Sequence, residues 1–510
     1  MAALSGLLLA LPFLHTSLFA FCWLAFVPLL LAIRHATARE SYLLGLVAGL
    51  AFQICATYWI VDFVATLKGY NATLSFAVAL LFWFYCAQVT GLVALLFTWI
   101  KRLALAHEII LFPVLFVALY NLFPVPFTVR PGESQSQFLI AIQAIEFTGV
   151  YGLDFVIAMT NVTVYLWFDR DAHRNRLVVT LVVAAVLVAW LGYGVHATSI
   201  WSKRLATWSS VPVGIVQPNE IPSIDTPPSK LGYSRAYPLE MELTEQLVAA
   251  GAELIIWPET RFKGYLAHDH VRRAFQHRLA AMATPLVFQD TDRVYLDGHK
   301  TEYNTAVFID SNGQLAGTYR KIQRIAFGEY IPLLEDIPAI RSWAGQYFGD
   351  FFSEVSPGNG PAVFNANPMK IAPLICYEVM FPIFTARALE GSPKGKVLVT
   401  LSNDGWFGDT RQHYQHLHAS SLRAVENRVP LIHVLNNGPS SVIAPDGRFV
   451  FKAELGVAGG YLADVPYSPS AGGSLFSRHP QWFIFTVYWG LALIALFALT
   501  RYTTTRLKQS

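Results

Sequence analysis

Charged residues are scarce in this sequence. Only 14% of its 510 residues are Asp, Glu, Lys or Arg, whereas 54% are hydrophobic. Soluble globular domains usually carry roughly 25% charged residues, so the chain as a whole is not an ordinary soluble domain. The apolar excess lies in residues 1–200 and in one stretch near the C-terminus, while residues 201–481 have a globular composition. This division predicts a membrane part and one large extramembrane domain.

Cysteine is also scarce, with four residues in the chain. Cys22, Cys55 and Cys86 lie in apolar stretches, where a buried cysteine behaves as a small hydrophobe. Only Cys376 falls in the globular region, so a disulfide cannot form within that region. A single thiol in such a domain is either reactive or buried and inert.

The apolar segments predict eight membrane helices, most of which approach the roughly 20 residues needed to cross a bilayer. The first of them is short. The expected helices are 2–15, 18–33, 42–64, 74–100, 107–125, 149–168, 177–197 and 482–500.

The basic residues predict the orientation of these helices. They follow every second helix, whereas the opposite loops at 65–73 and 126–148 hold only Lys68 and Arg130. The residues that follow the even-numbered helices are Arg34, Arg39, Lys101, Arg102, Arg170, Arg174, Arg176, Arg501, Arg506 and Lys508. Because loops rich in Lys and Arg stay in the cytoplasm, both termini are expected inside and the globular domain outside. In a bacterium this domain would be periplasmic, and the protein would lie in the cytoplasmic membrane.

Three parts follow from these patterns: a membrane domain at 1–200 with about seven helices, a catalytic domain at 201–481, and a last helix with a basic tail at 482–510. In the middle part, short runs rich in Val and Ile alternate with helical patterns such as Leu239–Ala250 and Val271–Ala283. Such alternation predicts an α/β domain. The expected strands are Val211–Val216, Glu253–Ile256, Thr305–Ile309, Gly317–Tyr319, Ile371–Ile375, Val397–Leu401 and Leu431–Leu435.

Polar residues follow several of these strands, where α/β domains bind their ligands. Trp257-Pro258-Glu259, Arg320-Lys321 and Cys376-Tyr377-Glu378 each come directly after a strand. A cysteine nucleophile needs a base or a positive field to become a thiolate. Glu259 could take the thiol proton, and Lys321 could stabilise the thiolate and then the oxyanion, helped by a backbone N–H near Tyr377.

These residues resemble the Glu–Lys–Cys triad of the nitrilase superfamily. Three further motifs resemble those of the apolipoprotein N-acyltransferase family, as does the order of membrane helices around one globular domain. The motifs are Phe327-Gly328-Glu329-Tyr330-Ile331-Pro332, Asn403-Asp404-Gly405-Trp406-Phe407-Gly408 and Asn436-Asn437-Gly438. The resemblance implies an α-β-β-α sandwich, with Glu259 as general base, Lys321 as oxyanion stabiliser and Cys376 as nucleophile. It also implies supporting or substrate-binding roles for Glu329, Tyr377, Glu378, Asn403, Trp406 and Phe407.

The family resemblance further implies a reaction between membrane lipids. An acyl chain would pass from a phospholipid to the cysteine as a thioester, and then to the N-terminal amine of a diacylglyceryl-cysteine apolipoprotein. A monomer is expected, without a cofactor, a metal or a nucleic-acid partner. A membrane-anchored amidase and a non-enzymatic lipid-handling homologue are the alternatives.

Several residues keep a second interpretation open. Glu329 and Glu378 fit structural salt bridges as well as direct roles in the site. His413, His416 and His418 suggest a metal site, but their spacing lacks the i, i+4 pair of helical zinc sites. An aromatic run between Glu329 and Cys376 fits a buried core, but the Gly and Asp residues that interrupt it favour a loop, and we expect a lid at the bilayer interface. Its residues are Trp343, Tyr347, Phe348, Phe351 and Phe352.

Overall fold

The computed structural model describes most of the chain. The described residues are 1–103, 107–169, 176–223, 229–260, 263–296, 299–325, 329–330, 355–389 and 391–507. The chain forms two compact units: residues 1–65, 70–203 and 474–510 make the first, and residues 66–69 and 204–473 make the second. The aromatic residues expected to form a lid lie outside the described residues, as do Phe327, Gly328, Ile331 and Pro332.

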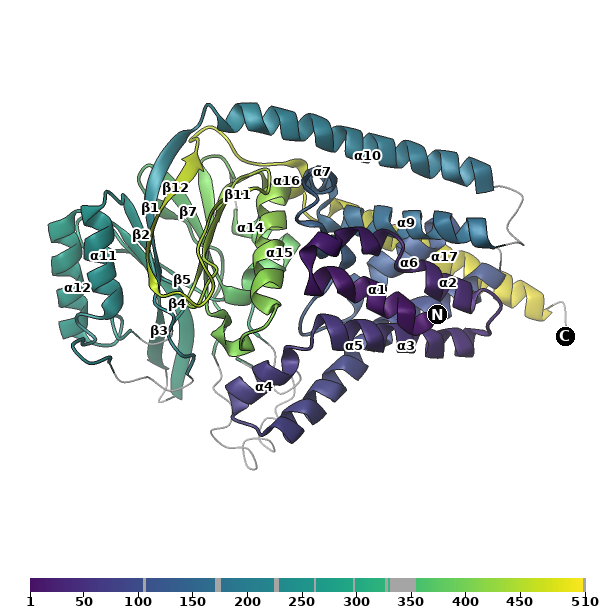
Figure 1. The fold of residues 1–510 in the computed structure, drawn as a ribbon, viewed down its shortest axis with the longest axis horizontal. Helices are drawn as coiled ribbons and strands as arrows, with labels where there is room; N and C mark the ends of the chain where they lie inside the picture. Colours follow the sequence, from purple (N-terminus) through teal and green to yellow (C-terminus); the bar gives the residue numbers. More distant parts are fainter. Residues whose placement is uncertain are drawn as a thin grey trace. The chain divides into compact units, whose positions relative to one another are not determined.

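The first unit is helical (Figure 1). Its longer helices are α1 (Ala2–Leu14), α3 (Ala38–Ala56), α4 (Ile60–Lys68), α5 (Ala72–Arg102), α6 (Glu108–Leu122), α9 (Val150–Phe168), α10 (Arg176–Leu205) and α17 (Trp482–Leu507). Its shorter helical segments are η1 (Thr16–Trp23), α2 (Val27–Ile33), η2 (Pro131–Gln135), α7 (Leu139–Ile142), α8 (Ile145–Thr148) and α16 (Leu475–Arg478).

Each of the eight apolar segments expected to cross a membrane coincides with helical structure. Four helical segments in the described part of the chain are long and apolar enough to span a bilayer: Thr16–Ile33, Ala72–Arg102, Val150–Phe168 and Arg176–Leu205. The bent pair Ala38–Ala56 and Ile60–Lys68 would make a fifth. The segments at 2–15, 107–125 and 482–500 match shorter apolar helices, so eight spans remain a prediction.

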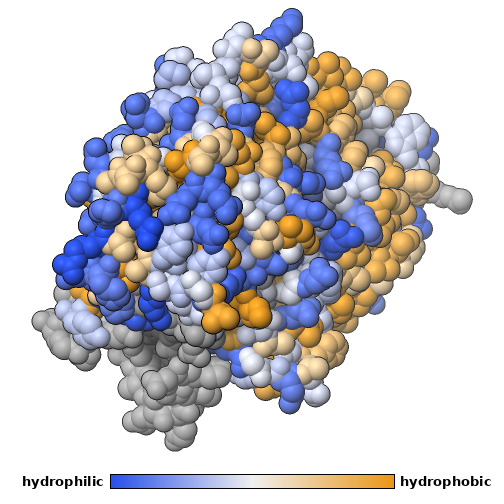
Figure 2. Space-filling model, turned by 60° about the vertical axis from the view of Figure 1, so that its left-hand side comes forward, coloured by the Kyte–Doolittle hydropathy of each residue, from blue (hydrophilic) through white to orange (hydrophobic). Residues whose placement is uncertain are grey.

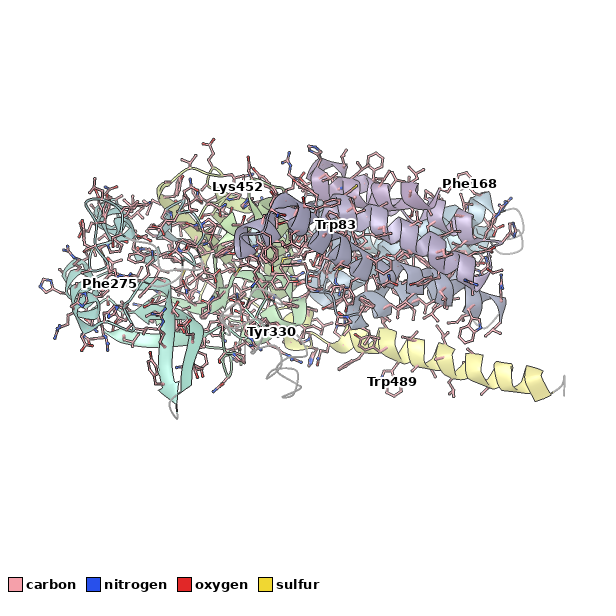
Figure 3. The ribbon with its side chains drawn as sticks, turned by 90° about the horizontal axis from the view of Figure 1, so that it is seen from below. Trp83, Phe168, Phe275, Tyr330, Lys452 and Trp489 are labelled. Atoms are coloured by element: carbon pink, nitrogen blue, oxygen red, sulfur yellow. The ribbon has the colours of Figure 1, made fainter. Side chains whose placement is uncertain are left out.

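Large apolar side chains cover the outside of the long helices. Leu81 on α5, Val188 on α10 and Trp489 on α17 are each more than 70% exposed. Apolar residues dominate parts of the surface in Figure 2, and Trp489 projects away from α17 in Figure 3. Lipid tails would cover such side chains at no hydration cost, which supports the membrane character of this unit.

The second unit contains two six-stranded sheets. The first has the order β12-β1-β2-β3-β4-β5 and the second β11-β10-β9-β8-β7-β6. The strands of the first sheet are β1 (Ser209–Gln217), β2 (Leu254–Ile256), β3 (Leu286–Leu296), β4 (His299–Ile309), β5 (Leu315–Arg320) and β12 (Gly459–Tyr467). Those of the second are β6 (Phe364–Ala366), β7 (Met369–Ile375), β8 (Lys396–Ser402), β9 (Leu431–Leu435), β10 (Ser441–Ile443) and β11 (Phe449–Lys452).

A pair of helices packs against each sheet. Helices α11 (Leu239–Ala249) and α12 (Asp269–Met282) cover the first sheet, and α14 (Pro382–Ala388) and α15 (Gln412–Asn427) cover the second. The unit is therefore the α-β-β-α sandwich that the sequence predicted. Strands and helices do not alternate throughout. Strands β3, β4 and β5 form an antiparallel meander without a helix between them, and so do β9, β10 and β11.

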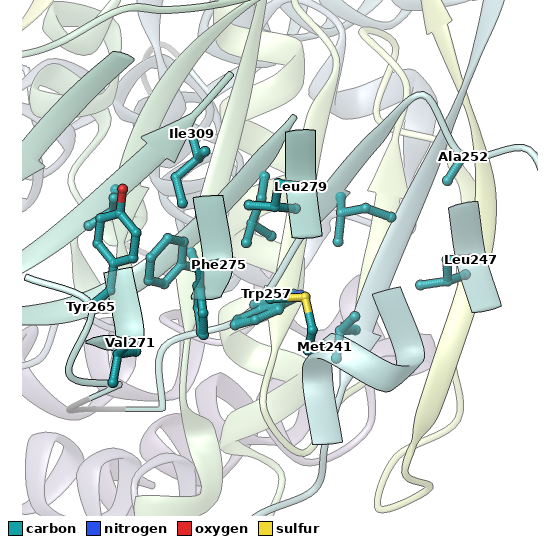
Figure 4. Packing of buried hydrophobic residues seen from close by; sticks show 14 residues of the cluster. Met241, Leu247, Ala252, Trp257, Tyr265, Val271, Phe275, Leu279 and Ile309 are labelled. Atoms are coloured by element: carbon teal, nitrogen blue, oxygen red, sulfur yellow. The ribbon is translucent and has the colours of Figure 1, made fainter. Parts of the chain in front are cut away.

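The hydrophobic core beside the first sheet anchors the segment that leads from β2 to Glu259. Trp257 follows β2 and is fully buried, with Phe275 and Phe288 packed at 5.6 Å between ring centroids (Figure 4). Its indole N–H donates to Thr244 Oγ1 at 2.9 Å. Because Trp257 is anchored in this way, the chain that leaves β2 toward Glu259 has a fixed direction.

Candidate active site

Cys376 begins the short helix η4 (Cys376–Met380) directly after β7. Its side chain is buried, with 4% of the residue exposed, and its φ of +53° lies in the left-handed region. A non-glycine residue held there is strained by about 1–3 kcal/mol, so the surrounding structure must hold it in place. Burial and the nearby Glu259 raise the pKa of the Cys376 thiol well above its usual value, against the opposing effect of Lys321. The resting cysteine is therefore a thiol.

Glu259 is the nearest candidate for a base. It accepts a hydrogen bond from Asn304 Nδ2 at 2.6 Å, and its charge acts directly on the thiol of Cys376. Burial and the neighbouring Glu329 raise the pKa of Glu259 above its usual value, although Lys321 opposes the shift. A raised pKa makes a carboxylate a better proton acceptor near neutral pH.

Lys321 follows β5 and is 1% exposed. Its Nζ lies 2.9 Å from Glu329 Oε1, in a buried ion pair. Burial alone would lower the pKa of Lys321, but Glu329, Glu259 and Cys376 together hold that pKa above its usual value. The ammonium therefore remains charged throughout the physiological range of pH.

Asn304 joins the two carboxylates. Its Nδ2 donates to Glu259 Oε1 at 2.6 Å and is 3.4 Å from Glu329 Oε1. Glu329 also accepts a hydrogen bond from the backbone N–H of Ile325 at 2.9 Å. The structure thus brings Glu259, Lys321, Cys376 and Glu329 together, as the sequence suggested, and adds Asn304. Nothing in the alternation of β4 marked Asn304 as part of a site.

Glu378 ties two strand ends together. Its carboxylate accepts hydrogen bonds from the backbone N–H groups of Ile322, Gln323 and Ile375 at 2.7, 3.0 and 2.8 Å. The hydroxyl of Tyr319 donates to both of its oxygens at 2.9 Å. Burial raises the pKa of Glu378 to about 7, against these backbone hydrogen bonds. Glu378 therefore positions the Lys321 loop relative to Cys376.

The other supporting residues follow the neighbouring strands β7 and β8. The ring of Tyr377 packs edge-on against Phe381 at 5.0 Å. Asn403 caps the turn η5 (Asp404–Phe407), accepting from the Gly405 N–H at 3.2 Å and from Asn436 Nδ2 at 3.1 Å. Phe407 is buried and Trp406 is half-buried.

The three histidines of α15 have protein neighbours. His413 Nε2 lies 2.7 Å from the carbonyl oxygen of Gly408, His416 pairs with Asp404, and His418 packs against Phe449. In the part of the chain that the structure describes, no three His, Cys, Asp or Glu side chains form a group that could hold a metal ion. The contact between His416 and Asp404 was not foreseen from the sequence, which had suggested only a metal role for this histidine.

Comparison with known proteins places this geometry in a family. Residues 5–163 match the model of the apolipoprotein N-acyltransferase N-terminal domain, and residues 226–467 match the carbon-nitrogen hydrolase model. An apolipoprotein N-acyltransferase of Geobacter metallireducens is 31% identical over 98% of this chain and 95% of its own length. The chain belongs to the apolipoprotein N-acyltransferase family. This confirms the family, the nitrilase-like fold and the enzyme class that the sequence indicated.

Two further matches have lower sequence identity. The apolipoprotein N-acyltransferase of Rickettsia typhi is 27% identical over 89% of this chain and 88% of its own length. Among solved structures, an amidase from Nesterenkonia sp. is similar at 18% identity, with a TM-score of 0.34 over 50% of this chain and 90% of the amidase. As a member of the apolipoprotein N-acyltransferases, the chain is an acyltransferase with a nitrilase-type domain.

Proposed function

We propose that the protein transfers an acyl chain from a membrane phospholipid to the N-terminal amine of a diacylglyceryl-cysteine apolipoprotein, through a thioester on Cys376. The observation that carries this proposal is the meeting of one thiol, one ammonium and one acidic base in a buried site at Cys376, Lys321 and Glu259. The names of the relatives support the lipoprotein as acceptor.

The first half-reaction acylates the cysteine. Glu259 takes the thiol proton, and the Cys376 sulfur attacks the ester carbonyl of the phospholipid. The ammonium of Lys321 and the backbone N–H of Tyr377 stabilise the oxyanion of the tetrahedral intermediate. The intermediate collapses, the C–O bond breaks, and Glu259 returns its proton to the departing lysophospholipid alkoxide. The thioester remains on the enzyme.

The second half-reaction transfers the acyl group. The uncharged α-amine of the apolipoprotein attacks the thioester carbonyl, and Glu259 takes the proton that the new amide nitrogen loses. The C–S bond then breaks, and the thiolate recovers its proton from Glu259. Each proton moves between groups inside the site, so water is not required as a proton carrier.

Charge balance favours this assignment of roles. Two carboxylates, Glu259 and Glu329, lie beside the ammonium of Lys321, so these three groups carry one excess negative charge when both carboxylates are ionised. Ionising Cys376 to solvent would add a second negative charge in a buried place, at high cost. Passing the proton to Glu259 leaves the net charge unchanged, because the carboxylate is neutralised as the thiolate forms.

The location is part of the same proposal. Basic loops after alternate helices support a cytoplasmic-membrane protein with both termini inside and residues 201–481 in the periplasm. The proposed partners are therefore a phospholipid donor, an apolipoprotein acceptor and the bilayer, with the protein acting as a monomer.

Mass spectrometry of the intact protein tests the thioester. After incubation with phospholipid and no acceptor, we expect the wild type to gain one acyl mass that neutral hydroxylamine removes. Cys376→Ser should gain no hydroxylamine-labile mass. Addition of a diacylglyceryl-cysteine peptide should discharge the wild type and produce the N-acyl peptide. Discharge to free fatty acid alone would instead support the amidase alternative.

A further inference from the structure

A buried imidazole faces the backbone of the nucleophile. His416, on α15, is 2% exposed, and its Nε2 lies 3.3 Å from the carbonyl oxygen of Cys376. Its Nδ1 lies 3.0 Å from each carboxylate oxygen of Asp404, which is fully buried. The two half-reactions above use neither residue.

The hydrogen bonds define the charge of this pair. Carbonyl and carboxylate oxygens only accept hydrogen bonds, so an imidazole with both nitrogens on such oxygens needs a proton on each. Ser402 Oγ donates to Asp404 Oδ1 at 3.0 Å, which fits an ionised carboxylate. Although burial raises the pKa of Asp404, His416 outweighs it and holds that pKa below its usual value. This arrangement, with an acceptor at each ring nitrogen, matches an imidazolium bound to a carboxylate.

Two other histidines neighbour this pair. The ring of His433, on β9, meets that of His416 edge-on at 4.7 Å, and burial lowers the pKa of His433 to about 3. His433 is thus neutral and adds no second positive charge. His413, which bonds the Gly408 carbonyl through Nε2, acts on Asp404 only at longer range. Asp404 holds Nδ1 of His416 while Nε2 faces the Cys376 carbonyl.

The geometry of the peptide unit links the hydrogen bond at the Cys376 carbonyl to the N–H of Tyr377. The peptide unit between Cys376 and Tyr377 is planar, and in a trans peptide the C=O and N–H groups point in opposite directions. When His416 holds the carbonyl oxygen, the N–H of Tyr377 is directed away from His416. A charged hydrogen bond at the carbonyl also polarises the amide and strengthens its N–H as a donor. The left-handed φ of Cys376 makes such support necessary.

We propose that Asp404 and His416 are positioning residues that aim and polarise the Tyr377 N–H as an oxyanion donor. His416 acts through the backbone of Cys376 and exchanges no proton with the substrate. The inference rests on the proposed function, because an oxyanion forms only if Cys376 adds to a carbonyl.

Two reactions of the same sulfur separate this role from a purely structural one. Acylation by dioleoylphosphatidylethanolamine in detergent micelles passes through an oxyanion. Alkylation by iodoacetamide displaces iodide and forms none. We expect His416→Leu to slow acylation by about 10- to 10³-fold, in the range for a lost oxyanion donor. Its rate of alkylation at Cys376, followed by peptide mass spectrometry, should stay within about threefold of the wild type.

A second variant should have an intermediate effect. His416→Gln keeps an N–H that can reach the Cys376 carbonyl but has no charge. We expect its acylation to slow by roughly 2- to 10-fold, the difference between a charged and a neutral hydrogen bond. It carries the same comparison if His416→Leu does not fold. His418→Gln is the matched control on the same helix, since His418 is buried against Phe449, and both of its rates should equal those of the wild type.

The outcomes are distinct. Slower acylation with normal alkylation supports the inference. Equal slowing of both reactions, or wild-type acylation in His416→Leu, overturns it and leaves the proposed function standing. A wild-type protein that takes no acyl group in this assay overturns the proposed function, and the inference with it.

Discussion

Each of the two units buries a cluster of charged side chains, and the clusters differ in what their charges face. In the membrane unit, Arg130 Nη1 lies 3.8 Å from Asp154 Oδ2, and Arg130 Nη2 donates to the Tyr120 carbonyl at 3.2 Å. Asp154 Oδ1 accepts from the Gly132 backbone at 2.7 Å. In the catalytic unit, Lys321 lies between two carboxylates and beside a thiol.

We interpret the Arg130–Asp154 pair as structural and the Lys321 cluster, in line with the proposed function, as reactive. The Arg130–Asp154 pair has one charge of each sign. Its hydrogen bonds join the end of α6, at the Tyr120 carbonyl, to the backbone N–H of Gly132 in η2. The Lys321 cluster has more acidic groups than cations and includes a thiol whose proton can move. Burial is similar in both, so charge imbalance and a mobile proton, rather than burial, mark the reactive site.

The largest expected effect is on the base. Glu259→Gln keeps the size and the burial of the side chain but removes the proton acceptor. We expect acyl-thioester formation to slow by about 10²- to 10⁴-fold, the usual loss for a general base. Single-turnover acylation followed by mass spectrometry measures this, and an unchanged rate would contradict the role of Glu259.

The equivalent change in the membrane unit should affect stability and not chemistry. Arg130→Met leaves Asp154 buried without its cation, which we expect to lower the free energy of unfolding by about 3–5 kcal/mol. Thermal unfolding in detergent measures the loss. Per folded molecule, iodoacetamide should alkylate Cys376 at the wild-type rate. A reduced rate would show that the two clusters are coupled.

Glu378 combines features of both clusters, because it is a buried carboxylate that bonds backbone groups beside the site. In Glu378→Gln, the new amide N–H₂ faces donors instead of accepting from them. We expect a loss of about 2–4 kcal/mol in the free energy of unfolding, from the hydrogen bonds broken. Acylation should slow as well, because the Lys321 loop loses its fixed position. Denaturant unfolding paired with the acylation assay checks both effects.

The pH dependence of the acylation rate should reflect the pKa of Glu259 and its interaction with Lys321. Glu259 acts only when deprotonated, so the rate rises with pH as its carboxylate loses a proton. Burial raises the pKa of Glu259, and this acidic limb should therefore lie above that of an ordinary glutamate. Lys321→Met should move the limb further upward, because the ammonium lowers that pKa. A downward shift would contradict the charge balance described here.

The smallest effect is expected for an exposed pair. Asp269 and Arg272 lie 2.8 Å apart on α12, and their side chains are 78% and 38% exposed. Solvent screens such a pair, so Asp269→Ala should change the free energy of unfolding by only about 0.3–0.5 kcal/mol. If the free energy of unfolding fell by more than about 1 kcal/mol, an exposed ion pair would contribute nearly as much to stability as a buried one, and burial would matter less than we infer.

The sequence predicted the structure best where apolar residues follow a regular pattern along the chain. Apolar segments of the predicted length coincide with helices, and the Val- and Ile-rich runs coincide with strands. Glu259, Lys321 and Cys376 each follow a strand, as the sequence predicted, but β2 and β5 belong to one sheet and β7 to the other, so the packing of the two sheets brings them together. The bounds of the parts at 200 and 481 and the number of spans stay predictions, because no membrane fixes the ends of the short helices.

Patterns read along the chain therefore determined the α/β class of the second unit and the residue types after its strands, while the sandwich followed from the family resemblance of the motifs. Only the tertiary structure decided which polar residues act together. Asn304 lies in a strand, Glu378 bonds groups more than 50 positions away, and His416 reaches a carbonyl 40 positions earlier in the chain. Such contacts depend on how sheets and helices pack, and no spacing in the sequence records them.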